Sequence, residues 1–212
     1  MFSITIIILI LTCIISFTAF SNQRVIDDLI FYPPAITQRN QWYRFITNGV
    51  IHADIAHLAF NMFSFYMFGE FVERYFVAIF DEKGKILYLA MYVSALAVCL
   101  IPTYFQNRDN YYYRSLGASG AVSAVIFAGI FLAPTIKLGL LFLPAFIPGF
   151  VFGPLYLILS AYMAKRGGDN INHSAHFWGA VWGVVFVIVT CLLLTGFNPI
   201  TSFLNQIKDY FS

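Results

Sequence analysis

Charged residues are scarce in this sequence. Lys, Arg, Asp and Glu make up 10% of the 212 residues and 60% are hydrophobic, whereas about 25% of an ordinary soluble domain is charged. The net charge is +2, and no basic run suggests a nucleic-acid partner. The composition therefore excludes an ordinary soluble domain and indicates a protein embedded in a lipid bilayer.

Cysteine is equally scarce. Cys13, Cys99 and Cys191 lie singly in three apolar runs, so the sequence offers no disulfide framework and gives no indication of a redox compartment. We expect all three to be small buried packing residues. The first apolar run starts Met1-Phe2-Ser3 and lacks the positive segment of a signal peptide, so we expect a retained first helix.

Long apolar windows account for most of the chain. Five charge-free windows reach the length of about 20 residues that a spanning helix needs, and a sixth does so if Glu70, Glu73 and Arg74 lie at the membrane edge. We predict an all-α membrane protein of one domain, residues 1–212, with six transmembrane helices at approximately 3–20, 55–74, 86–105, 117–133, 150–164 and 174–196.

Two segments between these helices have a character of their own. The long first loop, 21–54, contains Trp42 and Tyr43, and because such aromatic residues favour the membrane–water interface we expect it to be partly embedded. The stretch from Pro134 to Pro154 is apolar but broken by prolines, which predicts an irregular or re-entrant piece before the fifth helix.

A serine between glycines opens the fourth apolar run, in Gly117-Ala118-Ser119-Gly120. The two glycines let another backbone approach the serine hydroxyl closely. A helix N-terminus also offers unpaired N–H groups that suit a developing oxyanion. Taken alone, this pattern is more typical of helix packing than of catalysis.

Polar residues in two other helices complement this serine. His57 and Asn61 are four residues apart and share a helix face. His176 lies on the same face as Gly179 and Gly183, a GxxxG pair that lets helices pack closely in a membrane. Interhelical hydrogen bonding would be a sufficient reason for these polar residues.

Together these residues predict a nucleophile with its base. If the sixth helix docks its glycine face into a small-residue groove of the fourth, formed around Ser119, Ser123 and Ala124, His176 reaches the Ser119 hydroxyl. His57 and Asn61 would then donate hydrogen bonds to an oxyanion. Since no acidic residue stands near His176 in the sequence, we predict a Ser–His dyad without an assigned third member.

At these residues the chain resembles the rhomboid intramembrane serine proteases of the basic six-helix form, over nearly its whole length. The family's Trp-x-Arg and His-x4-His-x3-Asn patterns match Trp42/Arg44 and His52/His57/Asn61. Its Gly-x-Ser-Gly and Ala-His-x2-Gly-x3-Gly motifs match residues 117–120 and Ala175, His176, Gly179 and Gly183.

The resemblance implies that Ser119 attacks the scissile carbonyl, that His176 is the general base, and that His57, Asn61 and the Ser119 backbone N–H form the oxyanion hole. Gly117, Gly120, Gly179, Gly183, Arg44 and Trp42 would support the site. It also implies a rhomboid-like bundle that cleaves single-pass membrane proteins in or near a transmembrane segment, without a metal or cofactor. We expect a multi-pass protein of a bacterial inner membrane.

Three features depart from this pattern. Ser123 stands where the family usually carries an aromatic residue that stacks on the catalytic histidine. Seven cations lie in the loops that the family places outside and five in those it places inside, which mildly opposes the expected topology. The four histidines admit a metal site, but acidic partners are scarce, so we expect His52 and His173 to be hydrogen-bonding residues of a loop or cavity rim.

Two other functions remain open. An inactive rhomboid-like protein could bind transmembrane clients, although such relatives usually lose the serine or the histidine. A small channel or transporter would also use intramembrane polar residues, but the chain shows no pair of interrupted helices in two corresponding halves.

Overall fold

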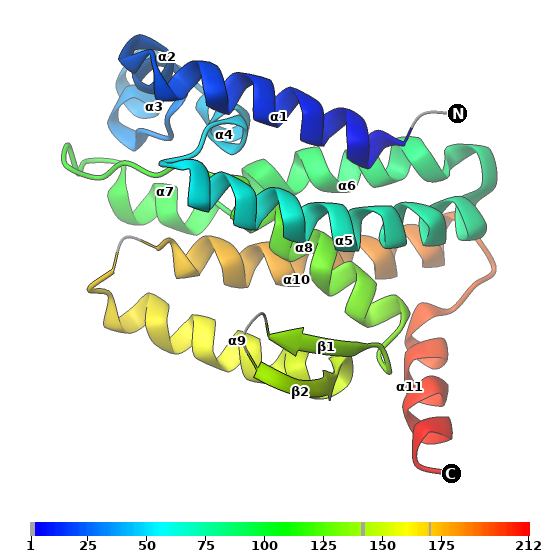
Figure 1. Ribbon diagram of the computed structural model, residues 1–212. Coiled ribbons are helices and arrows are strands. Elements are labelled where there is room, and N and C mark those ends of the chain that lie inside the picture. The colour runs from blue at the N-terminus through cyan, green and yellow to red at the C-terminus, as the bar shows by residue number, and fades with distance from the viewer. Residues whose placement is uncertain (1–2, 141–142, 170) are drawn as a thin grey trace.

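Helices dominate the structure, a computed structural model that describes residues 3–140, 143–169 and 171–212 (Figure 1). The six longer helices of the bundle are α1 (Ile4–Phe20), α5 (Ile55–Phe80), α6 (Gly84–Val98), α8 (Ser119–Leu132), α9 (Gly149–Arg166) and α10 (His173–Leu194). Shorter helices are α2 (Gln23–Leu29), α3 (Pro33–Arg39), α4 (Arg44–Thr47), α7 (Ile101–Asn107) and α11 (Pro199–Tyr210), with 3-10 turns η1 (Asn48–Val50) and η2 (Asp81–Lys83).

Among the described residues, two helical stretches are long and apolar enough to cross a membrane. One is Ile55–Asn107, which comprises α5, η2, α6 and α7, and the other is α10. Both expose much apolar surface, since only 44% and 28% of their most apolar windows are buried. Helices α1 and α8 are apolar but shorter.

The segment 21–54 is a folded cap of short helices and not an open loop. Arg44, which is 6% exposed, holds it together. Its Nη1 donates to the carbonyl oxygens of Asp27 and Ile30 at 2.8 and 2.7 Å, and its Nε donates to Gln41 at 2.7 Å. Trp42 stacks on Phe45 with ring centroids 6.0 Å apart. Arg44 therefore satisfies backbone carbonyls that a helix or sheet would otherwise pair.

The prediction of an irregular piece before the fifth helix is wrong. Residues Lys137–Leu140 and Leu143–Pro148 form an antiparallel hairpin, β1 and β2, with Lys137 opposite Pro148. The hairpin pairs the backbone groups of an apolar stretch, which is the reason such a segment need not stay irregular. Pro154 lies inside α9, while residues 141–142 of this stretch lie outside the described residues.

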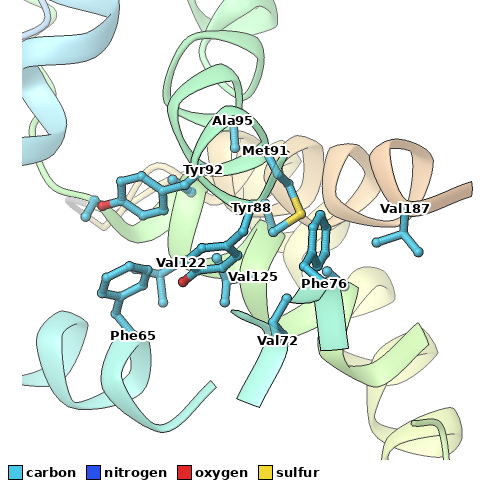
Figure 2. Packing of buried hydrophobic residues seen from close by; sticks show 14 of the residues in the cluster. Phe65, Val72, Phe76, Tyr88, Met91, Tyr92, Ala95, Val122, Val125 and Val187 are labelled. Atoms are coloured by element: carbon cyan, nitrogen blue, oxygen red, sulfur yellow. The ribbon is translucent and has the colours of Figure 1, made fainter. Parts of the chain in front are cut away.

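Helix α8 forms the centre of the bundle. It passes between α5 and α10 (Figure 1), and 11 of its 14 residues are buried. Around it lies the main hydrophobic core (Figure 2), to which α5, α6, α8 and α10 contribute Phe65, Val72, Phe76, Tyr88, Met91, Tyr92, Val122, Val125 and Val187. The first residue of α8 is thereby held on a helix that is packed on several sides.

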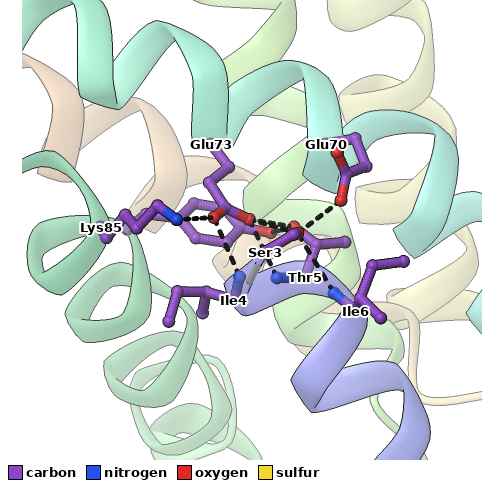
Figure 3. Close-up of polar contacts among 8 residues, drawn as sticks. Ser3, Ile4, Thr5, Ile6, Glu70, Glu73 and Lys85 are labelled. Carbon is purple, nitrogen blue, oxygen red and sulfur yellow. Dashed lines mark hydrogen bonds and ion pairs between the residues drawn. The ribbon is translucent and has the colours of Figure 1, made fainter. Parts of the chain in front are cut away.

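A buried carboxylate anchors the start of α1 to α5 (Figure 3). Glu73, 5% exposed, accepts hydrogen bonds from the backbone N–H groups of Ile4 and Thr5, both at 2.9 Å, and from the hydroxyls of Ser3 and Thr5. The ammonium of Lys85 lies 3.9 Å away. A negative charge at a helix N-terminus is favourable, and here it satisfies two N–H groups that the helix itself leaves unpaired.

We expect Glu73→Gln to destabilise the protein by about 2–3 kcal/mol. The amide NH₂ group would replace a carboxylate oxygen and would face N–H and O–H groups that need an acceptor. Glu70→Gln is the matched control, since the Glu70 carboxylate accepts a bond from Ser3 alone among the described residues. The measurement is unfolding in mixed detergent micelles. Equal losses for the two variants would contradict the anchoring role of Glu73.

Candidate functional site

The segment before Ser119 is held from two sides. The backbones of Ser115 and Phe31 exchange hydrogen bonds of 3.1 and 3.0 Å, and the Gly117 N–H donates to the Asn48 carbonyl at 2.9 Å. Gly117 has a φ of 116°, which favours glycine. Ser119 then begins α8, where the first N–H groups have no acceptor within the helix.

Helix α10 packs on α8 backbone to backbone. A Cβ atom on Gly179 would overlap the carbonyl oxygen of Gly120, and one on Gly183 would overlap that of Ala124. The predicted docking of the glycine face is thus observed. It brings the His176 Nε2 to 2.7 Å from the Ser119 Oγ. When the hydroxyl donates, Nε2 is the unprotonated nitrogen and Nδ1 carries the proton.

The groove that receives α10 differs from the predicted one. Gly120 and Ala124 line it, whereas Ser123 is turned toward α9. The Ser123 and Tyr156 hydroxyls lie 3.3 Å apart, and Ser123 is 4% exposed. A larger side chain at position 123 would have to displace Tyr156. The chain therefore has no aromatic residue at position 123 itself, and an aromatic residue of α9, Tyr156, contacts this position instead.

His57 stands at the start of α5 beside the serine segment. Its Nδ1 accepts from the Ala53 N–H at 3.4 Å, which leaves Nε2 as the protonated nitrogen. A Cβ on Gly117 would lie 2.8 Å from the His57 Cε1 and 3.0 Å from Nε2. Only a glycine at position 117 therefore leaves room for this imidazole two residues before Ser119.

Asn61 lies one helical turn further along α5 and is 3% exposed. Its Nδ2 donates to the backbone carbonyl of His57 at 3.0 Å. The amide has two hydrogens, and this bond uses one of them. His57 and Asn61 thus present donors from one face of α5, as their four-residue spacing predicted.

His52 is a hydrogen-bonding residue of the connection before α5, as expected, and it is wholly buried instead of lying at a cavity rim. Its Nε2 accepts from the Ala118 N–H at 3.4 Å and its Nδ1 lies 3.0 Å from the Ser16 Oγ, which also donates to the Val50 carbonyl. Burial, with a smaller contribution from His57, lowers the pKa of His52 to about 4. A neutral imidazole therefore fixes the peptide that precedes Ser119.

Sequence reasoning missed the groups that hold the start of α10. The Asn172 side chain accepts from the Ala175 N–H at 3.0 Å and donates to Thr103 of α7 at 3.2 Å. Asn is a favoured helix N-cap, and that preference was the available signal. His173, expected to be a hydrogen-bonding residue of a loop or cavity rim, begins α10 and hydrogen-bonds Asp169 at 2.9 Å. It also packs edge-on against His176 with ring centroids 5.9 Å apart. Its hydrogen bond lowers the pKa of the Asp169 carboxyl.

The predicted residues differ in how closely they approach the pair. Ser119 and His176 are in direct contact, and the His57 ring lies against Gly117, two residues before Ser119. Gly120, Gly179 and Gly183 form the contact between α8 and α10, and Asn61 donates a hydrogen bond to the His57 carbonyl. Trp42 and Arg44 lie in the folded cap 21–54. Within the described residues, no group of three or more His, Cys, Asp or Glu side chains is placed to hold a metal ion.

A comparison with protein families matches residues 39–193 to a model described as Rhomboid domain. The RHOMBOID-like protein 12, mitochondrial, of Arabidopsis thaliana is 33% identical over 144 residues, which cover 64% of this chain and 42% of that protein. The chain thus spans about two fifths of that relative's length.

Two further relatives are of different lengths. The rhomboid protease GlpG of Haemophilus influenzae is 29% identical over 167 residues, which cover 76% of this chain and 77% of that protein. The presenilin-associated rhomboid-like protein, mitochondrial, of Homo sapiens is 29% identical over 139 residues, covering 64% and 35%. These names include both bacterial and mitochondrial proteins and do not favour a bacterial inner membrane for this chain.

We expect Gly183→Ala to separate α10 from α8, because its Cβ would meet the backbone of Ala124. Gly196→Ala is the matched control, since a Cβ there meets nothing within 4 Å. The thermal midpoint in detergent should fall for Gly183→Ala and stay unchanged for Gly196→Ala. Wild-type stability of Gly183→Ala would show that the close approach is not required.

We expect His52 to make stability depend on pH. Its pKa is about 4 when folded and about 6.5 when unfolded, so protons bind the unfolded chain better. The contribution is complete above about pH 6.5 and is lost as the pH falls toward 4, by about 3 kcal/mol. His52→Gln should remove this part of the acid loss in chemical unfolding. Parallel pH curves for both proteins would contradict the assignment.

Proposed function

The chain belongs to the rhomboid family, and on this premise we propose that it is a serine endopeptidase that cleaves membrane-anchored proteins in or near a transmembrane segment. As a rhomboid protein with long apolar helices it is an integral membrane protein. The observation that carries the proposal is the distance of 2.7 Å between the Ser119 Oγ and the His176 Nε2. This is the contact of a nucleophile with its general base.

In the proposed reaction, the Ser119 oxygen attacks the scissile carbonyl while its proton passes to the His176 Nε2. The resulting imidazolium returns this proton to the leaving amine, so that an acyl-enzyme forms on Ser119. A water molecule then attacks the acyl carbonyl and gives a proton to Nε2. This proton passes to the Ser119 oxygen as the ester bond breaks and the acid product leaves. These steps need the tautomer in which Nδ1 carries the proton and the Ser119 hydroxyl donates to Nε2, and the distance of 2.7 Å accommodates that bond.

We propose that the oxyanion is bound by His57, Asn61 and the Ser119 backbone N–H. In support, the His57 Nε2 carries a proton and stands beside Gly117, and the Ser119 N–H is at a helix N-terminus. The fixed donors would need no reorganisation during the reaction, and each is worth about 10²–10³ in rate in soluble hydrolases.

The proposal extends to the membrane arrangement. The six longer helices would each span the bilayer, with the folded cap 21–54 partly in the headgroup layer, where the exposed Trp42 and Tyr43 suit an aromatic belt. The substrates would be single-pass membrane proteins, and neither metal nor cofactor takes part in the proposed steps.

A binder of transmembrane clients is the alternative. Its recognition surface would need no reactive hydroxyl, yet here α10 packs so closely on α8 that His176 meets Ser119. That contact favours the enzyme.

We expect Ser119→Ala and His176→Ala each to reduce cleavage of a model single-pass substrate in liposomes to background, a loss of roughly 10⁶-fold in comparable dyads and triads. Ser202→Ala, on α11 and at the opposite end of α10 from His176, is the control and should cleave like the wild type. Wild-type protein should also be labelled by a fluorophosphonate and Ser119→Ala should not.

Two results would count against the protease. One is cleavage by Ser119→Ala at the wild-type rate. The other is a wild type that neither cleaves nor reacts with the fluorophosphonate yet retains substrate equally with and without the Ser119 hydroxyl, as a client binder would.

A further inference from the structure

The last helix, α11, lies across the bundle instead of along it. In Figure 1 it runs at a steep angle to α1, α5 and α10, at the end of the bundle where α10 finishes. Asn198 starts it by accepting hydrogen bonds from the N–H groups of Ile200 and Thr201, both at 3.1 Å. A helix in this orientation would lie along the plane of a membrane that the other helices cross.

One side of α11 is fixed to the protein. Phe203 stacks on Phe131 of α8 with centroids 5.1 Å apart, and Gln206 donates to the Leu132 carbonyl at 3.1 Å. Tyr210 packs against Phe150 of α9 at 5.4 Å. These contacts hold α11 against the end of α8 and the beginning of α9.

A second side carries exposed apolar residues. Ile200 is 42% exposed, Leu204 59% and Phe211, directly after the helix, 73%. With 3.6 residues per turn, positions four and eleven residues apart lie on one side of a helix, about a quarter turn from the side fixed to the protein. Phe211 meets Phe150 of α9 edge-on, with ring centroids 5.7 Å apart, and most of its ring stays exposed.

The third side is polar. Thr201, Asn205 and Lys208 are all exposed and lie at helical spacing next to the apolar stripe. A helix that only covered the end of the bundle would need two sides, one for the protein and one for water. The exposed apolar side of α11 therefore indicates an apolar environment that is neither the protein interior nor water.

The exposed apolar surface continues from α10. Leu192, Leu193 and Leu194 in its last turn are 50–76% exposed, and Phe197 in the connection to α11 is 38% exposed. Because α10 is apolar and long enough to span a membrane, its exposed leucines face lipid chains. The apolar stripe on α11 continues this exposed apolar surface beyond the point where the chain turns from α10 into α11.

We propose that α11 is an in-plane helix that binds the lipid bilayer at the boundary between headgroups and acyl chains. Ile200, Leu204 and Phe211 enter the apolar layer, while Thr201, Asn205 and Lys208 face water. This division of faces is the one that interfacial helices show. A second copy of the chain fits less well, since a stable interface buries about 800 Å² on each partner and this stripe offers three side chains.

Spin labels on single cysteines test the proposal in the full chain, with Cys13, Cys99 and Cys191 replaced by Ala. The labelled positions are Ile200→Cys and Leu204→Cys on the apolar stripe, with Thr201→Cys and Asn205→Cys as matched controls one residue away. In phosphatidylcholine vesicles, collision with oxygen and with a water-soluble nickel complex reports the depth of each label. We expect positions 200 and 204 to favour oxygen severalfold over positions 201 and 205.

Equally high accessibility to the nickel complex at all four positions would place α11 in water and overturn the proposal. Spin–spin broadening at position 204 that disappears on dilution with unlabelled protein would instead assign the stripe to a second copy. In a second format, Leu204→Trp in the chain with its own cysteines should be quenched more strongly than Asn205→Trp by lipids brominated near the headgroup. Equal quenching would also contradict the proposal.

Discussion

The close approach of α8 and α10 is the constraint on which the rest of the structure depends. Both helices are apolar, and in lipid no hydrophobic force drives them together, so packing and hydrogen bonds have to hold them. Gly179 and Gly183 let the α10 backbone rest on the carbonyl oxygens of Gly120 and Ala124. The 2.7 Å contact between His176 and Ser119 is a consequence of this packing, because both side chains lie at the ends of the packed helices.

Several polar side chains inside the bundle have partners on other helices and so join those helices. Glu73 joins α1 to α5, His52 joins Ser16 of α1 to the peptide before Ser119, and the hydroxyls of Ser123 and Tyr156 join α8 to α9. An unpaired polar group is costly in a low-dielectric interior. The partners are therefore specific, and they connect helices that apolar packing alone would leave free to slide.

The candidate site is built at the starts of three helices. Ser119 and His57 sit at helix N-termini, where backbone N–H groups are available. His176 is one turn into α10, whose start is capped by Asn172 and tied to Thr103. His173, the first residue of α10, packs edge-on against His176 and hydrogen-bonds Asp169 in the connection between α9 and α10.

The sequence by itself determined the helical membrane class, the shared helix face of His57 and Asn61, and the glycine face of α10 that carries His176 toward Ser119. Apolar windows, helical spacing and GxxxG pairs are local patterns. Only the tertiary structure decided which residues line the groove on α8, that the apolar stretch before α9 pairs as a hairpin, and that His52 is buried. It also decided that Tyr156 of α9 meets Ser123. These outcomes depend on contacts between residues far apart in the chain, and the spacing of residues along one helix or strand does not predict such contacts.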